Sequence, residues 1–146
     1  MDLSDDTLET IEALELCLSE IGFEGAWRAF LRAATTLLLP SLPPEASRWA
    51  EAADLYDAGR LTVSELEHKR ASAWKYLDHA GAGSAPSQTA GLRAVLFRLW
   101  PASSRTDWYG EARYFIEFCG HAGVDEATLH ALLKQCFAKV NRPIRV

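Results

Sequence analysis

Apolar residues recur along most of the chain at the spacing of an α-helix. Near the N-terminal end, Leu8, Ile11, Leu14, Leu18 and Ile21 all fall on one side of a helix at about 100° per residue. The same spacing predicts helices at about residues 5–21, 25–39, 44–59, 63–79, 88–100 and 107–119, and a last one after residue 125. No segment alternates apolar and polar residues between turn signals, so strands are not expected. The sequence therefore predicts an all-α bundle of about seven helices.

Each predicted helix carries an apolar stripe that we expect to face a shared core. Gly22 and Gly59 are expected to end the first and third helices, while Pro40 and Pro101 close the second and fifth. In chain order, from the second predicted helix to the last, the stripes are Trp27, Phe30, Leu31, Ala34 and Leu38; Trp49, Ala53 and Tyr56; Val63, Leu66, Ala73, Trp74 and Leu77; Leu92, Val95, Leu96 and Leu99; Trp108, Ala112, Phe115 and Cys119; and Leu129, Leu132, Leu133, Cys136, Phe137 and Val140.

Residues 62–70, TVSELEHKR, contain an E-x-x-H spacing of the kind that helix bundles use to hold metals. Its members, Glu65 and His68, also have a simpler explanation. Thr62 and Glu65 form a capping box, in which each side chain accepts a hydrogen bond from the other residue's backbone amide. Leu61 and Leu66 occupy the accompanying hydrophobic-staple positions. Because Glu65 and His68 lie opposite the apolar stripe, we expect a helix start here and no metal site.

Length and composition are those of one ordinary globular domain. The chain has 146 residues, of which 49% are hydrophobic and 24% charged, so a single domain over residues 1–146 is expected. The Gly- and Ser-rich stretch near residues 80–90 is expected to be a flexible loop. No apolar run is long enough to span a bilayer, and the acidic start differs from a secretory signal. These features favour a cytoplasmic protein without a membrane partner.

Catalytic and cofactor-binding signatures are not found in the sequence. A formal charge of −5 without a cluster of Lys or Arg argues against nucleic acid as the main partner. Cys119 and His121 form the best pair for nucleophilic catalysis, but a buried Cys beside a surface His is the favoured explanation. Cys17 and Cys136 are expected to be buried thiols as well. We therefore expect no enzyme activity, no catalytic residue and no cofactor.

Acidic residues are concentrated at the N-terminal end, where the first 24 residues contain no Lys or Arg. On the first predicted helix, Asp5, Glu9, Glu12 and Glu20 form one stripe opposite the apolar side. Such a stripe can dock a basic protein surface and steer its approach, although a merely solvated face stays open as an alternative. Tyr109 is expected to be exposed beside a buried neighbour, and is a further candidate anchor for a partner.

A resemblance to small all-helical bacterial immunity proteins is carried by three segments: LYDAGRLTVSELEHKRASAWKYLD, LRAVLFRLWP and DWYGEARYFIEFCGHAGV. The shared features are an aromatic–acid–Gly helix end, a capped helix with Arg70 and Trp74, a helix ending in Trp-Pro, and an aromatic helix. They lie within residues 54–124. Immunity proteins neutralise toxins used in interbacterial competition, so the resemblance implies a stoichiometric inhibitor of one cognate toxin. It transfers no binding residue, because specificity in that class lies in variable surface positions.

Two other interpretations stay open beside the immunity protein. A helical adaptor or chaperone that binds another bacterial protein would differ from it chiefly in genomic context. An enzyme would need a concave pocket with at least two titratable groups of shifted pKa, assembled only by the fold. The sequence favours an immunity protein whose acidic stripe meets a basic surface on its toxin, as a nuclease toxin would offer.

Overall fold

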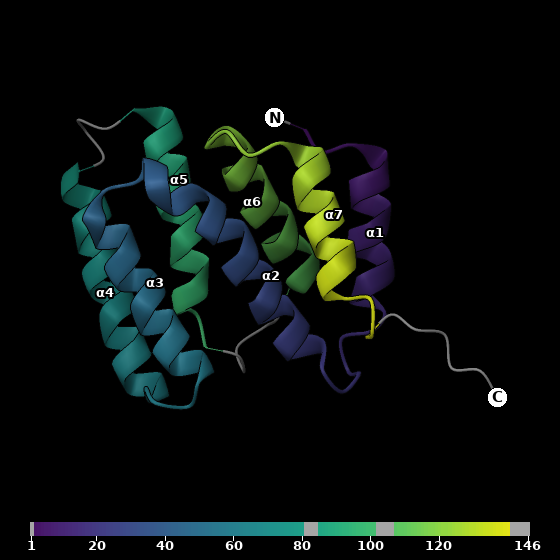
Figure 1. The fold of residues 1–146 in the computed structure, drawn as a ribbon, viewed down its shortest axis with the longest axis horizontal. Helices are drawn as coiled ribbons and strands as arrows, with labels where there is room; N and C mark the ends of the chain where they lie inside the picture. Colours follow the sequence, from purple (N-terminus) through teal and green to yellow (C-terminus); the bar gives the residue numbers. More distant parts are fainter. Residues whose placement is uncertain (1, 81–84, 102–106, 141–146) are drawn as a thin grey trace.

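Seven α-helices make up most of the structure, a computed structural model that describes residues 2–80, 85–101 and 107–140 (Figure 1). The described residues contain no strand, so the predicted all-α fold is confirmed. The helices are α1 (Asp5–Glu15), α2 (Phe23–Leu38), α3 (Pro44–Asp57), α4 (Val63–Ala80), α5 (Pro86–Leu96), α6 (Trp108–His121) and α7 (Glu126–Cys136). Two 3-10 turns, η1 (Leu39–Ser41) and η2 (Phe97–Leu99), extend α2 and α5. None of these helices is both long and apolar enough to cross a membrane.

Most helices begin where the local sequence satisfies their first amides. Ser4 and Asp107 cap α1 and α6, since their side chains accept hydrogen bonds from amides inside the first turn. Pro44 and Pro86 occupy the first turns of α3 and α5, where a missing N–H costs nothing. Because α5 begins at Pro86, the loop expected near 80–90 is helical over its last part, and residues 81–84 lie outside the described residues.

The first helix is shorter than the apolar pattern predicts. It ends at Glu15, and residues 16–22 turn the chain toward α2 through hydrogen bonds between residues three apart. Leu18 and Ile21 therefore leave the buried side and are exposed, so their predicted place in the core is wrong. Gly22 does not end α1; it precedes α2 with φ of 89°, a conformation that glycine adopts without strain.

Two adjoining clusters of apolar side chains form the core. The first lies among α1, α2, α6 and α7, where the rings of Trp27 and Trp108 meet edge to face with centroids 5.4 Å apart. The second lies among α3, α4, α5 and η2, and Figure 1 shows these helices gathered at the opposite side of the molecule. Helix α5 serves both clusters, because Ala94 faces the first while Leu92 and Val95 face the second.

Helix α4 buries a narrower stripe than expected. Leu66, Ala73 and Leu77 are buried, as predicted, but Val63 and Trp74 are 44% and 40% exposed. Both side chains lie at the edge of the stripe, roughly 60–80° from its centre at 100° per residue. Since α4 lies at the outer side of the bundle in Figure 1, the residues at this edge of its stripe are only partly covered by other helices. The expectation that Val63 and Trp74 face the core is therefore wrong.

A network of charged side chains joins the two clusters. Arg28 on α2 donates from Nε to Asp57 at 2.7 Å, and its other nitrogens donate to the carbonyl oxygens of Trp100 and Arg98. Arg98, which is buried, also donates to Asp54 at 2.6 Å. Buried guanidinium groups are stable only when acceptors surround them, so this network fixes α2 against the ends of α3 and α5.

Candidate functional site

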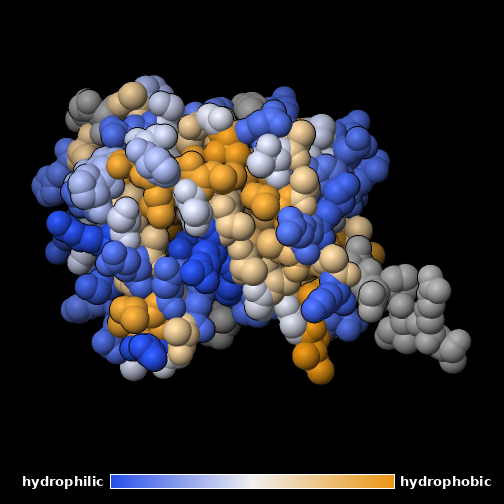
Figure 2. Space-filling model, viewed as in Figure 1, coloured by the Kyte–Doolittle hydropathy of each residue, from blue (hydrophilic) through white to orange (hydrophobic). Residues whose placement is uncertain are grey.

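The acidic face of α1, defined by Asp5, Glu9 and Glu12, is exposed to solvent. The opposite side of the helix is buried in the first core cluster. Within the described residues, no Lys, Arg or His forms an ion pair with these carboxylates. Figure 2 shows hydrophilic residues gathered at the edge of the molecule where α1 lies. This face is therefore negatively charged and not neutralised by neighbouring side chains.

Glu20 does not share the acidic face of α1. It was expected to continue the stripe, but α1 ends at Glu15 and Glu20 lies in the following turn, exposed to solvent. The helical register that would align Glu20 with Glu9 and Glu12 stops five residues before it. The four-residue stripe predicted from sequence is therefore reduced to three residues on the helix.

Hydrogen bonds from the last helix hold the start of α1 in place. The Glu126 carboxylate accepts from the Ser4 amide at 3.1 Å and from the Thr7 hydroxyl at 2.9 Å. The hydrogen bond from the Ser4 side chain, followed by those of Thr7 and the Ser4 amide, lowers the pKa of Glu126 below its ordinary value of 4.5. Thr10 and His130 add a contact of 2.7 Å between their side chains. The acidic face is thus carried by a helix with a fixed orientation.

Tyr109 is half-buried, and it lies at the start of α6 rather than on an open surface. Its neighbour Trp108 is buried, as predicted. The Tyr109 amide donates to the Glu15 carboxylate at 3.1 Å, which links α6 to the end of α1. The Arg113 guanidinium lies 6.0 Å from the centre of the Tyr109 ring. Tyr109 therefore has a clear packing role and offers only part of its ring to a partner.

A second exposed region, which the sequence did not reveal, carries large aromatic side chains. This aromatic surface is defined by Trp74, Trp100 and Tyr114, which are 40%, 41% and 59% exposed. Arg70 lies over the Trp100 ring, with Cζ 4.0 Å from the ring centre, and Arg93 lies 6.0 Å from that of Trp74. One feature of the sequence could have indicated this surface. Arg70 lies four residues before Trp74, so a charged side chain lies on the same side of α4 as the Trp74 ring.

One hollow opens on the aromatic surface between α4, α5 and α6, and a second lies next to it between α5 and α6. One has a volume of about 270 Å³ and is lined by Trp74, Leu96, Phe97, Trp100 and Tyr114 together with Arg93 and Phe118. The other has a volume of about 420 Å³ and also includes Arg93 and Phe118 among its lining residues. Arg93 and Phe118 thus line both hollows, which lie next to each other.

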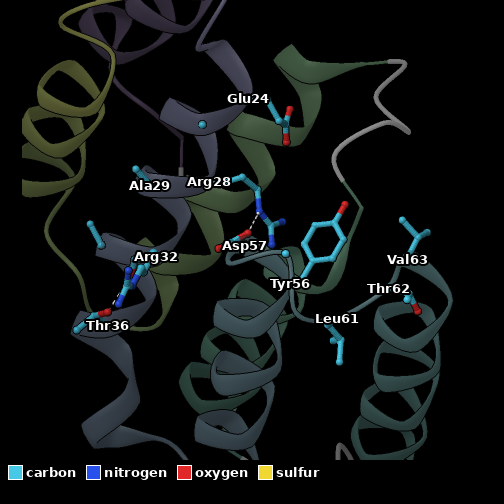
Figure 3. Close-up of a pocket in the computed structure, with 13 residues that line it drawn as sticks. Glu24, Arg28, Ala29, Arg32, Thr36, Tyr56, Asp57, Leu61, Thr62 and Val63 are labelled. Carbon is cyan, nitrogen blue, oxygen red and sulfur yellow. Dashed lines mark hydrogen bonds and ion pairs between the residues drawn. The ribbon is translucent and has the colours of Figure 1, made fainter.

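A groove runs between α2, the end of α3 and the start of α4, with a volume of about 1060 Å³ (Figure 3). Figure 3 shows Arg28 reaching into it toward Asp57 and the ring of Tyr56, whose centre lies 5.3 Å from the Arg28 Cζ. Arg32 lies 3.5 Å from Asp54 at the same groove. These charges already satisfy one another, so the groove is explained by the network that holds the helices together.

The E-x-x-H segment is a helix start. The Thr62 amide donates to the Glu65 carboxylate, and the Glu65 amide donates to the Thr62 hydroxyl, both at 3.1 Å. The backbone hydrogen bond from Thr62 is the main reason why the pKa of Glu65 lies below its ordinary value. His68 is exposed, and the described residues bring no three His, Cys, Asp or Glu together. The predicted capping box is confirmed.

Burial decides the state of the cysteine considered for catalysis. Cys119 is buried in the first core cluster, and loss of solvent raises the pKa of its thiol far above the ordinary value. A thiolate is the reactive form, so Cys119 is held in its unreactive state. Cys17 and Cys136 are only half-buried, which differs from the expectation that all three thiols are buried, and both pack against the first core cluster.

Comparison with known proteins gives no match for this chain. No family model matches it, and neither a curated protein nor a solved structure is significantly similar to it. Any assignment of function therefore rests on the chemistry of the surfaces described above.

Proposed function

We propose that this chain is a non-catalytic inhibitor of the immunity type, which binds and neutralises one bacterial toxin. The observation that carries the proposal is the acidic face of α1, where Asp5, Glu9 and Glu12 stand exposed and unpaired within the described residues. Carboxylates arranged in this way attract a basic protein surface and accelerate its correct encounter. The resemblance over residues 54–124 supports a toxin as the partner, and the acidic face supports a basic surface on that toxin.

The fixed orientation of α1 supports the same proposal. The Glu126 hydrogen bonds and the buried side of the helix restrain α1 before a partner arrives. A surface that is already ordered loses less conformational entropy on binding, and therefore binds more tightly for the same contacts. Tight binding is what a stoichiometric inhibitor requires.

The test begins with the neighbouring genes. An immunity gene lies directly beside a toxin gene, and its deletion harms the cell only while that toxin is active. The neighbouring protein, produced with this chain, should form a one-to-one complex whose affinity falls as salt is added. A neutral deletion beside an active toxin would contradict the proposal, and a complex with a harmless neighbour would favour an adaptor.

Charge reversal then locates the interface. Glu9→Lys combined with Glu12→Lys should weaken the complex and flatten its salt dependence, because both carboxylates face the basic partner. Glu51→Lys combined with Glu67→Lys is the matched control, since both residues are exposed on other helices and the change in net charge is the same. Equal affinities for the two double variants would show that the acidic face of α1 is only solvated.

A further inference from the structure

Two arginines beside the aromatic surface carry charge that no described acid neutralises. Arg70 donates one hydrogen bond, from Nη1 to the Leu99 carbonyl oxygen at 3.3 Å. Arg93 donates none to the described residues, and neither arginine forms an ion pair with a carboxylate of that part of the chain. On a chain with a formal charge of −5, these two guanidinium groups are positive charges without an acidic partner among the described residues.

Aromatic rings hold both guanidinium groups against the protein. The Arg70 Cζ lies 4.0 Å from the centre of the Trp100 ring, and the Arg93 Cζ lies 6.0 Å and 5.9 Å from those of Trp74 and Phe118. A guanidinium over a ring keeps its in-plane N–H groups for acceptors at its edge. Carboxylates fit that edge best, because their two oxygens accept two parallel hydrogen bonds.

The hollows provide places for apolar side chains beside these charges. The one lined by Trp74, Trp100 and Tyr114 has a volume of about 270 Å³, near the lower limit of about 300 Å³ for small-molecule pockets. It therefore suits a single large side chain better than a cofactor. Arg93 lines this hollow and the neighbouring one, so an apolar group placed in either lies close to a guanidinium.

We propose that the aromatic surface binds a short acidic peptide segment of another protein. Its carboxylates pair with Arg70 and Arg93, and a large apolar side chain enters the hollow beside Trp74. Trp, Tyr and Arg are the residues that contribute most to protein–protein binding, and here they are clustered. This site is separate from the acidic face of α1 and takes a partner of opposite charge, so neither proposal depends on the other.

Two other occupants fit the chemistry less well. Single-stranded nucleic acid stacks on aromatic rings, but it also needs a basic groove that follows several phosphates. The aromatic surface offers two unpaired guanidinium groups on an acidic chain, which match a peptide with a few carboxylates better. A second copy would place its acidic face on this surface, and such head-to-tail contacts would build a ring or an open filament of many copies.

The experiment selects peptides from a displayed library of random short sequences, with the intact chain as bait. The expected result is enrichment of peptides that combine Asp or Glu with a large apolar residue. Synthetic copies of the enriched peptides should shift the indole N–H signals of Trp74 and Trp100 in NMR spectra. The signals of the buried Trp27 and Trp108 should move less.

Variants then test the two charges. Arg93→Gln and Arg70→Gln should each weaken the selected peptide about tenfold, because each removes charge-assisted hydrogen bonds. Arg113→Gln is the matched control, since Arg113 is exposed, pairs with Glu117 at 3.6 Å and lines neither hollow. Its affinity should equal that of the wild type, and circular dichroism should show that all three variants are folded.

Several results would overturn the proposal. They are the absence of any enriched peptide, enrichment of basic peptides, and a loss of peptide affinity in Arg113→Gln as large as that in Arg93→Gln and Arg70→Gln. Stronger binding of an oligothymidine probe than of the selected peptides would assign the surface to nucleic acid instead. Self-association that disappears in Arg93→Gln would assign it to a second copy of the chain.

Discussion

Glu126 shows how one side chain joins distant parts of the sequence. It stands in the first turn of α7, where a carboxylate favours the helix N-terminus, and it also accepts hydrogen bonds from Ser4 and Thr7. The residues that it binds are more than 100 positions away in the chain. Helix spacing relates only neighbouring residues, so the sequence predicted a helix after residue 125 but gave no sign of this contact.

The lowered pKa of Glu126 makes this contact sensitive to acid. Because the folded state favours the ionised carboxylate, its contribution to stability is complete above pH 4.5 and declines as the pH falls through the lower pKa of the folded state. Glu126→Gln should therefore lower the free energy of unfolding by about 1 kcal/mol at pH 7. When both proteins are unfolded in urea, the difference between their free energies of unfolding should shrink below pH 4.5.

Glu12→Gln provides the control for this titration. Glu12 is exposed on α1 and forms no ion pair or hydrogen bond within the described residues. Its substitution should change the free energy of unfolding at pH 7 by less than Glu126→Gln does. If the free energies of unfolding of Glu126→Gln and the wild type differ by the same amount at neutral and acidic pH, the ionised carboxylate does not have the stabilising role assigned to it.

At the scale of single helices, the start of α4 gives the simplest test. Thr62→Ala removes the hydroxyl that accepts from the Glu65 amide, and it should cost about 1 kcal/mol of unfolding free energy. Thr62→Ser keeps a hydroxyl at the same place and should cost much less. Chemical unfolding monitored by circular dichroism measures both. Equal losses for the two variants would mean that the methyl group of Thr62, and not the cap, matters.

Helix α7 contains two neighbouring leucines, one fully buried and the other only partly buried. Leu133 is completely buried in the first cluster, whereas Leu132 only packs against its edge. Leu133→Ala should cost about 2–5 kcal/mol, the range for large-to-small changes in a packed core, and Leu132→Ala should cost clearly less. The apolar pattern placed both residues in one stripe. Similar losses in urea unfolding would mean that α7 is buried more deeply than its exposure indicates.

The helices themselves could be predicted from sequence because periodicity and caps are local properties. Thr62, Asp107 and Pro44 satisfy or replace amides within their own first turn, so their roles are visible without tertiary contacts. Trp74 and Glu20 could not be placed in this way. Their exposure and register depend on where α4 lies in the bundle and where the chain turns after α1.

At the scale of the whole molecule, two clusters of apolar side chains act as one core. Helix α5 contributes Ala94 to one cluster and Val95 to the other. Arg28 crosses between them, since it extends from α2 to Asp57 at 2.7 Å and to the Trp100 carbonyl oxygen at 3.0 Å. The two proposed binding surfaces are supported by this shared core, so they should be lost together on unfolding.

Unfolding should therefore be a single cooperative transition. Circular dichroism reports all helices, while fluorescence reports the buried Trp27 and Trp108 of the first cluster and Trp49 of the second. Both signals should give the same urea midpoint, as two-state behaviour requires. Leu133→Ala in the first cluster and Leu66→Ala in the second should each lower that common midpoint. If one cluster melts first, the two signals will separate, and the variants will shift only the transition of their own cluster.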